Sequence, residues 1–245
     1  MNLRSPDTLL VVAVLSLVVL FSIAGATAPS AVPIDEFVLA NEKQFSQHNE
    51  ELMIRHFFGD RRDGVFLDVG CAWPRRNSTT FFLDSFLGWT GIGIDAVEHY
   101  REGWEQFRPE STFLHYAVCD ESGGTITFHQ AAWSGVSSLY EEHAESYSKQ
   151  ASTPVEVRKT TLNDVLTNAG LESIDFLSMD IEGAEPLALK GFDIERFAPK
   201  LVCIEMHDGA KNDTIVFDYF VEHGYERIDE YLDHDFANWY FKPKH

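Results

Sequence analysis

The chain has 245 residues, which is room for one domain of about 200 residues and a short appendage. Hydrophobic residues make up 44% and charged residues 24% of the sequence, as in a soluble globular protein that buries a core. Asp and Glu number 39 against 19 Lys and Arg, so the formal net charge is −20. A surface this acidic repels phosphate backbones, which argues against a nucleic-acid partner and favours small neutral molecules, sugars or cationic ligands.

The N-terminus carries an uncharged apolar run, LLVVAVLSLVVLFSI, at residues 9–23. Small flanking residues extend this run to about 20 residues, the length of a transmembrane helix. We therefore expect a single-pass membrane anchor, the only contact of the chain with a membrane, and Arg4 before the run predicts a cytosolic N-terminus. The alternative is a signal peptide cleaved after the small residues 24–26, which leaves a secreted or lumenal protein. The expected organisation is an anchor or signal segment at 1–27, a linker at 28–43 and a soluble domain at 44–245.

Beyond residue 44, short β-rich apolar runs alternate with segments of helical period, which is typical of an α/β sheet. In chain order, strands are expected at residues 65–69, 91–95, 112–118, 125–129, 155–160, 174–179 and 201–206. Helices are expected at residues 78–87, 97–107, 162–169, 184–192 and 214–223. Two final strands, 225–228 and 236–241, are so close in sequence that they should pair antiparallel. The pattern predicts a doubly wound, mostly parallel sheet of seven strands with a C-terminal antiparallel hairpin.

Acidic residues follow the first two strands, where an open α/β sheet binds its ligands. The first strand ends in Asp68-Val69-Gly70, and the glycine lets the backbone turn close against a ligand. The full GxGxxG fingerprint is absent and Pro74 interrupts the loop, which disfavours a nicotinamide dinucleotide and the corresponding oxidoreductase. Asp95 ends the second strand, where it can accept both hydroxyls of a ribose; the alternative is that it caps the helix at 97–107.

A second group of acids follows the strands at 174–179 and 201–206. The segment DIEGAE at 180–185 places three carboxylates at a strand-to-helix turn, and IEMHD adds Glu205, His207 and Asp208 after the next strand. If the two strands are neighbours, Asp180, Glu205 and Asp208 can share one divalent metal ion such as Mg²⁺, with His207 as a base or a ligand. The alternatives are that the acids of the turn complement the dipole of the following helix, and that the histidine faces solvent.

The motifs LDVG, GIDA and DFLSMDIEGAEPLALKGF, followed by IEMHD, resemble those of the FkbM family of S-adenosylmethionine-dependent methyltransferases over about residues 44–242. The resemblance implies the Rossmann-like class I methyltransferase fold and methyl transfer to a hydroxyl of a sugar or other small metabolite. It also implies S-adenosylmethionine as cofactor, with its methionine portion near the first turn, its ribose on Asp95 and its adenine beside residues 116–120. The implied cofactor-binding residues are Asp68, Gly70, Asp95, Ala96, Asp120 and Asp180. The implied catalytic residues are Asp180, Glu182 and His207, with Asp180 or His207 as the base.

Two segments near the first motif need a separate interpretation. CAWP at 71–74 replaces the usual glycine-containing loop of the family, and Ser178 stands where many members have lysine. The segment SQHNEE at 46–51 is similar to a family helix that precedes the first motif, and its acids are expected to favour the helix N-terminus. The altered loop leaves a second functional hypothesis, a membrane-tethered binding domain that keeps the fold without catalysis.

Overall fold

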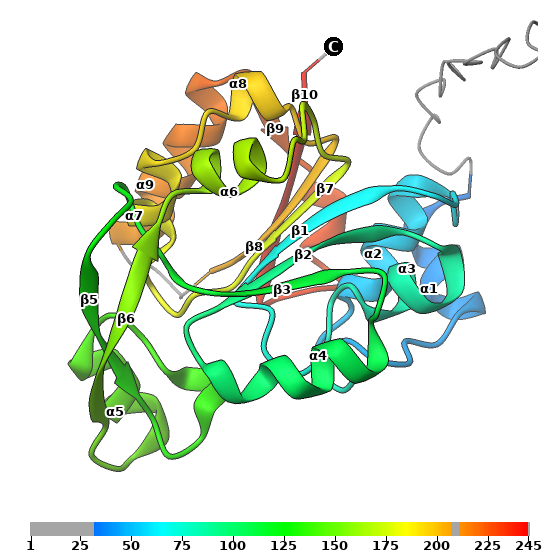
Figure 1. Cartoon of the computed structure of the whole chain (residues 1–245). Coiled ribbons are helices and arrows are strands. Elements are labelled where there is room, and N and C mark those ends of the chain that lie inside the picture. The colour runs from blue at the N-terminus through cyan, green and yellow to red at the C-terminus, as the bar shows by residue number, and fades with distance from the viewer. Residues whose placement is uncertain (1–31, 207–210, 245) are drawn as a thin grey trace, which may run out of the picture.

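The computed structural model describes residues 32–206 and 211–244. Its centre is a seven-stranded sheet of order β3-β2-β1-β7-β8-β10-β9 (Figure 1). The first five strands in this order are parallel, and β10 is antiparallel to both of its neighbours. The predicted fold class is therefore confirmed, including the hairpin of β9 and β10. The bounds are β1 (Val65–Val69), β2 (Thr90–Asp95), β3 (Thr112–His115), β7 (Phe176–Met179), β8 (Leu201–Glu205), β9 (Tyr225–Arg227) and β10 (Asn238–Pro243).

Helices cover both faces of this sheet, as the doubly wound prediction requires (Figure 1). The first face packs against α2 (Glu50–Phe58), α3 (Phe81–Leu87) and α4 (Arg101–Phe107). The second face packs against α6 (Leu162–Asn168), α7 (Glu185–Lys190), α8 (Ile194–Phe197) and α9 (Lys211–Glu222). Short 3-10 turns lie at η1 (Glu98–Tyr100), η2 (Ser134–Val136) and η3 (Asp229–Tyr231).

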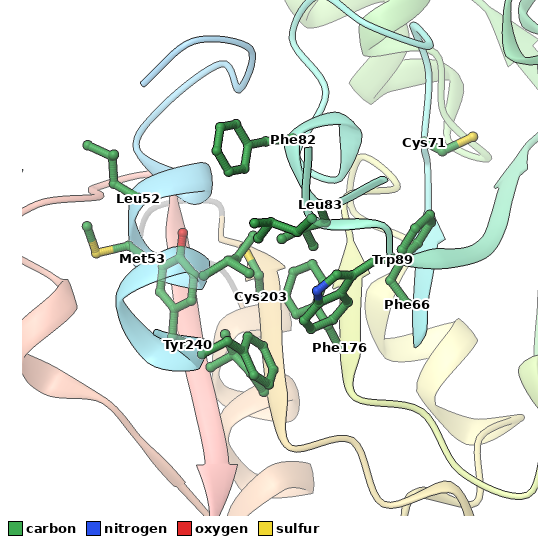
Figure 2. Close-up of a cluster of buried hydrophobic side chains, with 14 of the residues drawn as sticks. Leu52, Met53, Phe66, Cys71, Phe82, Leu83, Trp89, Phe176, Cys203 and Tyr240 are labelled. Carbon is green, nitrogen blue, oxygen red and sulfur yellow. The ribbon is translucent and has the colours of Figure 1, made fainter. Parts of the chain in front are cut away.

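The core consists of two layers, one on each face of the central sheet. Successive side chains of a strand point to opposite faces, so each central strand contributes to both layers. In β1, Phe66 belongs to the first layer and Leu67 to the second; in β7, Phe176 and Leu177 divide in the same way. Figure 2 shows side chains of the first layer, in which residues from strands meet residues from α2 and α3. The labelled examples are Leu52, Met53, Phe66, Phe82, Leu83, Phe176, Cys203 and Tyr240. Burial on both faces explains why these strands read as continuous apolar runs.

A small second sheet corrects one predicted strand. The segment expected as one strand at 112–118 is two strands, β3 and β4 (Ala117–Val118). The break falls at Tyr116, whose N–H donates to the carbonyl of Asp95, and β4 then pairs with β6 (Thr153–Thr160) rather than continuing beside β2. With β5 (Thr125–Gln130) this makes a sheet of order β4-β6-β5, which lies with α5 (Glu141–Ser148) at one side of the molecule (Figure 1).

The segment expected as a linker, residues 28–43, contains the helix α1 (Ile34–Ala40). Ile34 is buried, and α1 packs against α2. The buried His56 of α2 makes hydrogen bonds of 2.8 Å with the Tyr231 hydroxyl and with the carbonyl of Val32, which attaches the start of the described chain to the domain. The division of the chain into anchor, linker and domain stays a prediction.

The expectation of a single-pass membrane protein is corrected. Across residues 32–206 and 211–244, every helix is too short or too polar to cross a bilayer. The described part of the chain therefore gives no support to a transmembrane anchor or to a membrane-tethered binding domain. The apolar run at 9–23, on which both expectations rest, lies outside the described residues.

Candidate functional site

A cavity of about 270 Å³ opens at the carboxyl ends of β1, β2, β7 and β8. Four acids that lie far apart in the sequence line it: Asp68, Asp95, Asp180 and Glu205. They converge because β1 lies between β2 and β7, and β8 lies next to β7 in the same parallel arrangement. The carboxyl ends of parallel strands meet at one edge of a sheet, so the topology brings the predicted acids together.

Gly70 brings the ends of β1, β2 and β7 close together. Its φ of +79° is a left-handed conformation, and its N–H donates to the carbonyl of Ile94 at 2.8 Å. A Cβ at this position would overlap the backbone carbonyl of Asp180. Only glycine satisfies both conditions without strain, so the predicted close turn after the first strand has a steric cause.

Asp68 is buried at the cavity and is held by the residue that precedes α3 and, through it, by the residue that follows α4. Its carboxylate accepts a hydrogen bond of 2.5 Å from the Thr80 hydroxyl, which in turn accepts one from the buried guanidinium of Arg108. Burial raises the pKa of Asp68, while Thr80 and the positive charge of Arg108 act in the opposite direction. Asp68 therefore orders the loop before α3 as well as lining the cavity.

Asp95 joins the two loops that flank the cavity. Its Oδ1 accepts from the N–H of Val97 at 2.7 Å, and its Oδ2 accepts from the N–H of Ala72 at 2.9 Å. Burial is the largest cause that raises its pKa to about 7. Each carboxylate oxygen has a second lone pair, so the same group can still accept ribose hydroxyls. Asp95 therefore holds the turn before η1 instead of capping a helix at 97–107, since the N-cap residue of η1 is Val97. The interpretation of Asp95 as a ribose ligand is compatible with this geometry.

The residues implied beside the ribose and the adenine do not all lie at the cavity. Ala96 and residues 116–118 line it. Asp120 is exposed and is not among the lining residues. The chain therefore leaves the cavity wall after Val118, the last residue of β4.

Asp180, Glu182 and Glu205 form an acidic cluster in which one carboxylate oxygen of each lies within 4.8 Å of the others. Asp180 has solvent-exposed surface at the cavity, although protein surrounds its carboxyl group. This surrounding protein is the largest cause that raises the pKa of Asp180 well above its ordinary value, and repulsion from the charge of Glu205 is the second. Burial also raises the pKa of Glu205 to about 8, and a hydrogen bond joins the two groups. A hydrogen bond between two carboxyl groups exists only while one of them carries a proton.

The turn that carries Glu182 is held from several sides. Glu182 has a φ of 55°, which is uncommon for a residue other than glycine, and its Oε2 lies 2.6 Å from Nε2 of His143. The Ser138 hydroxyl donates to the Glu182 carbonyl at 2.8 Å. Glu185 is buried and accepts from the N–H groups of Ile181 and of residue 183, which agrees with the structural interpretation of this acid at the start of α7.

Glu50 also lines the cavity, although the sequence predicted only that its carboxylate favours the N-terminus of a helix. It is buried on α2, accepts from the N–H of His48 at 2.7 Å, and has a pKa raised to about 7 by burial and by the charge of Asp235. The signal for it was helical spacing, because positions 50, 54 and 58 share one face, and Ile54 and Phe58 are core residues. Trp133 and Tyr147 line the cavity as well. Tyr147, and His143 beside Glu182, come from α5, a helix that was not predicted.

Only part of the predicted metal site lies among the described residues. His207 and Asp208 lie outside them, so their roles stay predictions. Among the described residues, the structure brings Glu182 next to Asp180 and Glu205. Three carboxylates are the type of ligand that a hard divalent cation prefers.

Comparisons with known proteins identify a family for most of the chain. Residues 62–227 match the family described as Methyltransferase FkbM domain. The chain is 29% identical over 124 residues to proteins named glycerol kinase from Borrelia duttonii (strain Ly) and Borreliella afzelii (strain PKo). That stretch is 51% of this chain, and it spans only 23% of the length of those relatives.

Similar solved structures include a TehB-like SAM-dependent methyltransferase from Corynebacterium glutamicum, with 12% identity, a TM-score of 0.43, and coverage of 86% of this chain and 94% of that one. Another is the 1,6-didemethyltoxoflavin-N1-methyltransferase of Burkholderia thailandensis, with 12% identity, a TM-score of 0.38, and coverage of 80% and 77%. The family match extends from the residues before β1 to the end of β9 and includes the carboxyl ends of β1, β2, β7 and β8, where the cavity opens. On the strength of this match, the chain belongs to the Methyltransferase FkbM domain family.

Proposed function

We propose that this protein is an S-adenosylmethionine-dependent O-methyltransferase that acts on a hydroxyl of a sugar or another small metabolite. The observation that carries the proposal is that Asp95, the Gly70 turn and the Asp180–Glu205 pair all face one cavity. Methyl transfer needs two reactants held side by side, and a single cavity with one wall for each reactant meets that need. Family membership supports the methyl-transfer part of the proposal.

The residues at the cavity fit this cofactor. Asp95 offers two carboxylate oxygens to a ribose, and Gly70 allows the backbone to approach the methionine portion. Residues 116–118 provide a wall for the adenine. The surrounding carboxylates favour a positive charge in the cavity. S-adenosylmethionine, when bound, supplies a methyl group on a positively charged sulfur.

The protein contributes alignment and a base. Asp180 and Glu205 lie where an acceptor hydroxyl would be held, and a carboxylate that has lost the shared proton can take up the proton of that hydroxyl. Their raised pKa makes them stronger bases than ordinary surface carboxylates. The predicted role of Mg²⁺ is not needed for these steps, and a comparison of rates before and after EDTA treatment decides whether a cation takes part.

The test is titration calorimetry with S-adenosylhomocysteine. We expect the unaltered protein to bind it, and we expect Asp95→Ala to weaken binding at least about tenfold, because hydrogen bonds to a charged group are lost. Asp120→Ala is the matched control, since that acid is exposed and away from the cavity, and it should leave the affinity unchanged. Melting curves check that both variants are folded. Absence of binding by the unaltered protein would contradict the proposal.

A further inference from the structure

One wall of the cavity is apolar and comes from the segment between β5 and the end of α5. We call the two aromatic residues Trp133 and Tyr147, together with the aliphatic Leu139, the aromatic wall. Trp133 is 49% exposed and Tyr147 is 56% exposed, although both are large rings. Exposed rings gathered at a concave site are typical of a ligand-binding surface, because a ligand that covers them removes apolar area from water.

The position of Trp133 is fixed by its neighbours. Its ring stacks on that of Trp73, with centroids 6.0 Å apart and an interplanar angle of 24°. The backbone at Gly135 packs so closely that an added Cβ would lie 2.7 Å from the Trp73 ring and 3.2 Å from the Trp133 ring. The adjoining Ser134 hydroxyl makes a 2.6 Å hydrogen bond with the hydroxyl of Tyr100. The ring is therefore presented in one orientation before any ligand arrives.

The aromatic wall is also tied to the acidic cluster. Ser138 donates to the backbone carbonyl of Glu182, and His143 pairs with its carboxylate at 2.6 Å. The ring of His143 stacks on that of Tyr147 with centroids 4.5 Å apart. Through these contacts one end of the wall is held beside the residues proposed to take up the acceptor's proton.

The residues that line the cavity disfavour acceptors that carry a phosphate or carboxylate group. Among the described residues that line it there are six carboxylates, from Glu50, Asp68, Asp95, Asp180, Glu182 and Glu205, and neither lysine nor arginine. The four residues 207–210, which read HDGA, add none in sequence. A phosphate or carboxylate held in this cavity would lose its water of hydration without a lysine or arginine to pair with, and every lining acid that is deprotonated would repel it.

We propose that the aromatic wall is the acceptor subsite and that it takes a sugar ring without phosphate or carboxylate groups. The inference rests on the proposed function and names its acceptor class. One face of a sugar ring carries C–H groups and can cover the ring of Trp133, while the hydroxyls at the ring edge reach toward Asp180 and Glu205. An uncharged or amine-bearing glycoside satisfies both the apolar and the acidic wall.

The experiment measures transfer of labelled methyl from S-adenosylmethionine to a panel of methyl glycosides, each paired with its phosphate ester and its amino analogue. We expect methylation of at least one neutral or amino glycoside, with kcat/KM about 100-fold lower for its phosphate ester. Trp133→Ala should raise the KM for the glycoside about tenfold, because apolar contact is lost, and leave the affinity for S-adenosylhomocysteine unchanged. Trp133→Phe should recover most of the loss. Phe107→Ala, at a 44% exposed ring outside the cavity, is the control and should change neither value.

Three results would overturn the inference while the proposed function stands. They are equal kcat/KM for the phosphate ester, an unchanged glycoside KM in Trp133→Ala, and binding of S-adenosylhomocysteine by a protein that methylates none of the glycosides. An equal weakening of glycoside and S-adenosylhomocysteine binding in Trp133→Ala would assign the wall to the cofactor instead. Failure of the unaltered protein to bind S-adenosylhomocysteine would contradict the proposed function itself, and the calorimetry separates that case from the others.

Discussion

Gly70 shows how a single residue controls the approach of two strands. Its left-handed φ and its contact with the Asp180 carbonyl both exclude a side chain, and the second constraint is the stronger because the contact is with backbone. For a residue other than glycine, the left-handed conformation alone costs about 1–2 kcal/mol. Overlap with a backbone atom then forces the ends of β1 and β7 apart.

We predict that Gly70→Ala lowers the free energy of unfolding by at least about 3 kcal/mol, from strain and steric overlap together. Gly59→Ala is the matched control, because Gly59 has a φ of +60° and no atom within 4 Å of an added Cβ. It should cost only about 1–2 kcal/mol, the conformational term alone. Urea denaturation of both variants measures the difference. Equal losses would show that the close approach at Gly70 contributes nothing.

Glu182 is the second residue whose backbone carries a cost. A non-glycine residue in the left-handed region costs of order 1–3 kcal/mol and persists only where its surroundings hold it. Ser138 and His143 hold it here, one through the carbonyl and one through the carboxylate. Both come from the segment around α5, so the strain at the acidic cluster depends on a distant element.

At the scale of elements, α5 is a short helix that contributes little to the core. Ala144 is its buried residue, and it belongs to a cluster of three with Ala131 and Val136. The hydrogen bond between His143 and Glu182 links this helix to the loop after β7. With so few apolar contacts, the helix depends on this pair for its position.

We predict that His143→Ala speeds amide hydrogen exchange in α5 about tenfold, because a partly buried, charge-assisted contact is lost. Exchange in β1 should not change, since that strand lies in the core of the main sheet. Glu142→Ala, an exposed position on the same helix, is the control and should leave exchange in α5 unchanged. Mass spectrometry of deuterated fragments makes the comparison. Unchanged protection of α5 in His143→Ala would rule out a role of the His143–Glu182 hydrogen bond in holding the helix.

At the scale of the whole molecule, buried acids make stability depend on pH. Burial raises the pKa of Glu50 and Asp95 to about 7 and that of Glu205 to about 8, whereas in an unfolded chain such groups titrate near 4. Between about pH 4 and 8 the folded protein therefore binds more protons than the unfolded chain. The stability that these groups contribute is fully present below their unfolded pKa and is lost as the pH rises through their folded pKa.

We predict that the melting temperature falls as the pH is raised from about 5.5 to about 8.5, and that Glu205→Gln makes this fall smaller, because the amide has no proton to lose. The net charge of −20 adds a general repulsion at high pH, so the informative quantity is the difference between variants. Glu105→Gln, at an exposed position on α4, removes the same charge and serves as the control. Scanning calorimetry over this pH range measures the slopes. Equal slopes for the two variants would contradict burial as the cause.

Much of the fold could be predicted from local patterns. The central strands read as apolar runs because both of their faces are buried, and the interval between the last two strands was short enough to require an antiparallel hairpin. The break at Tyr116 could not be predicted, because it depends on whether β4 finds its partner beside β2 or on β6, far along the chain. The helix α5 was missed for a related reason, since a single buried alanine gives it little apolar periodicity.

Local order along the chain was enough to predict the types of residue at the site and their place at the ends of strands. Asp68, Gly70, Asp95 and Asp180 were found in this way. Which of the charges share one buried space became visible only in the folded chain, which also added Glu50 and Tyr147 from elements outside the strands. Convergence depends on the order of strands in the sheet, and a raised pKa depends on the protein that surrounds a carboxyl group, and neither property belongs to a segment of the chain taken alone.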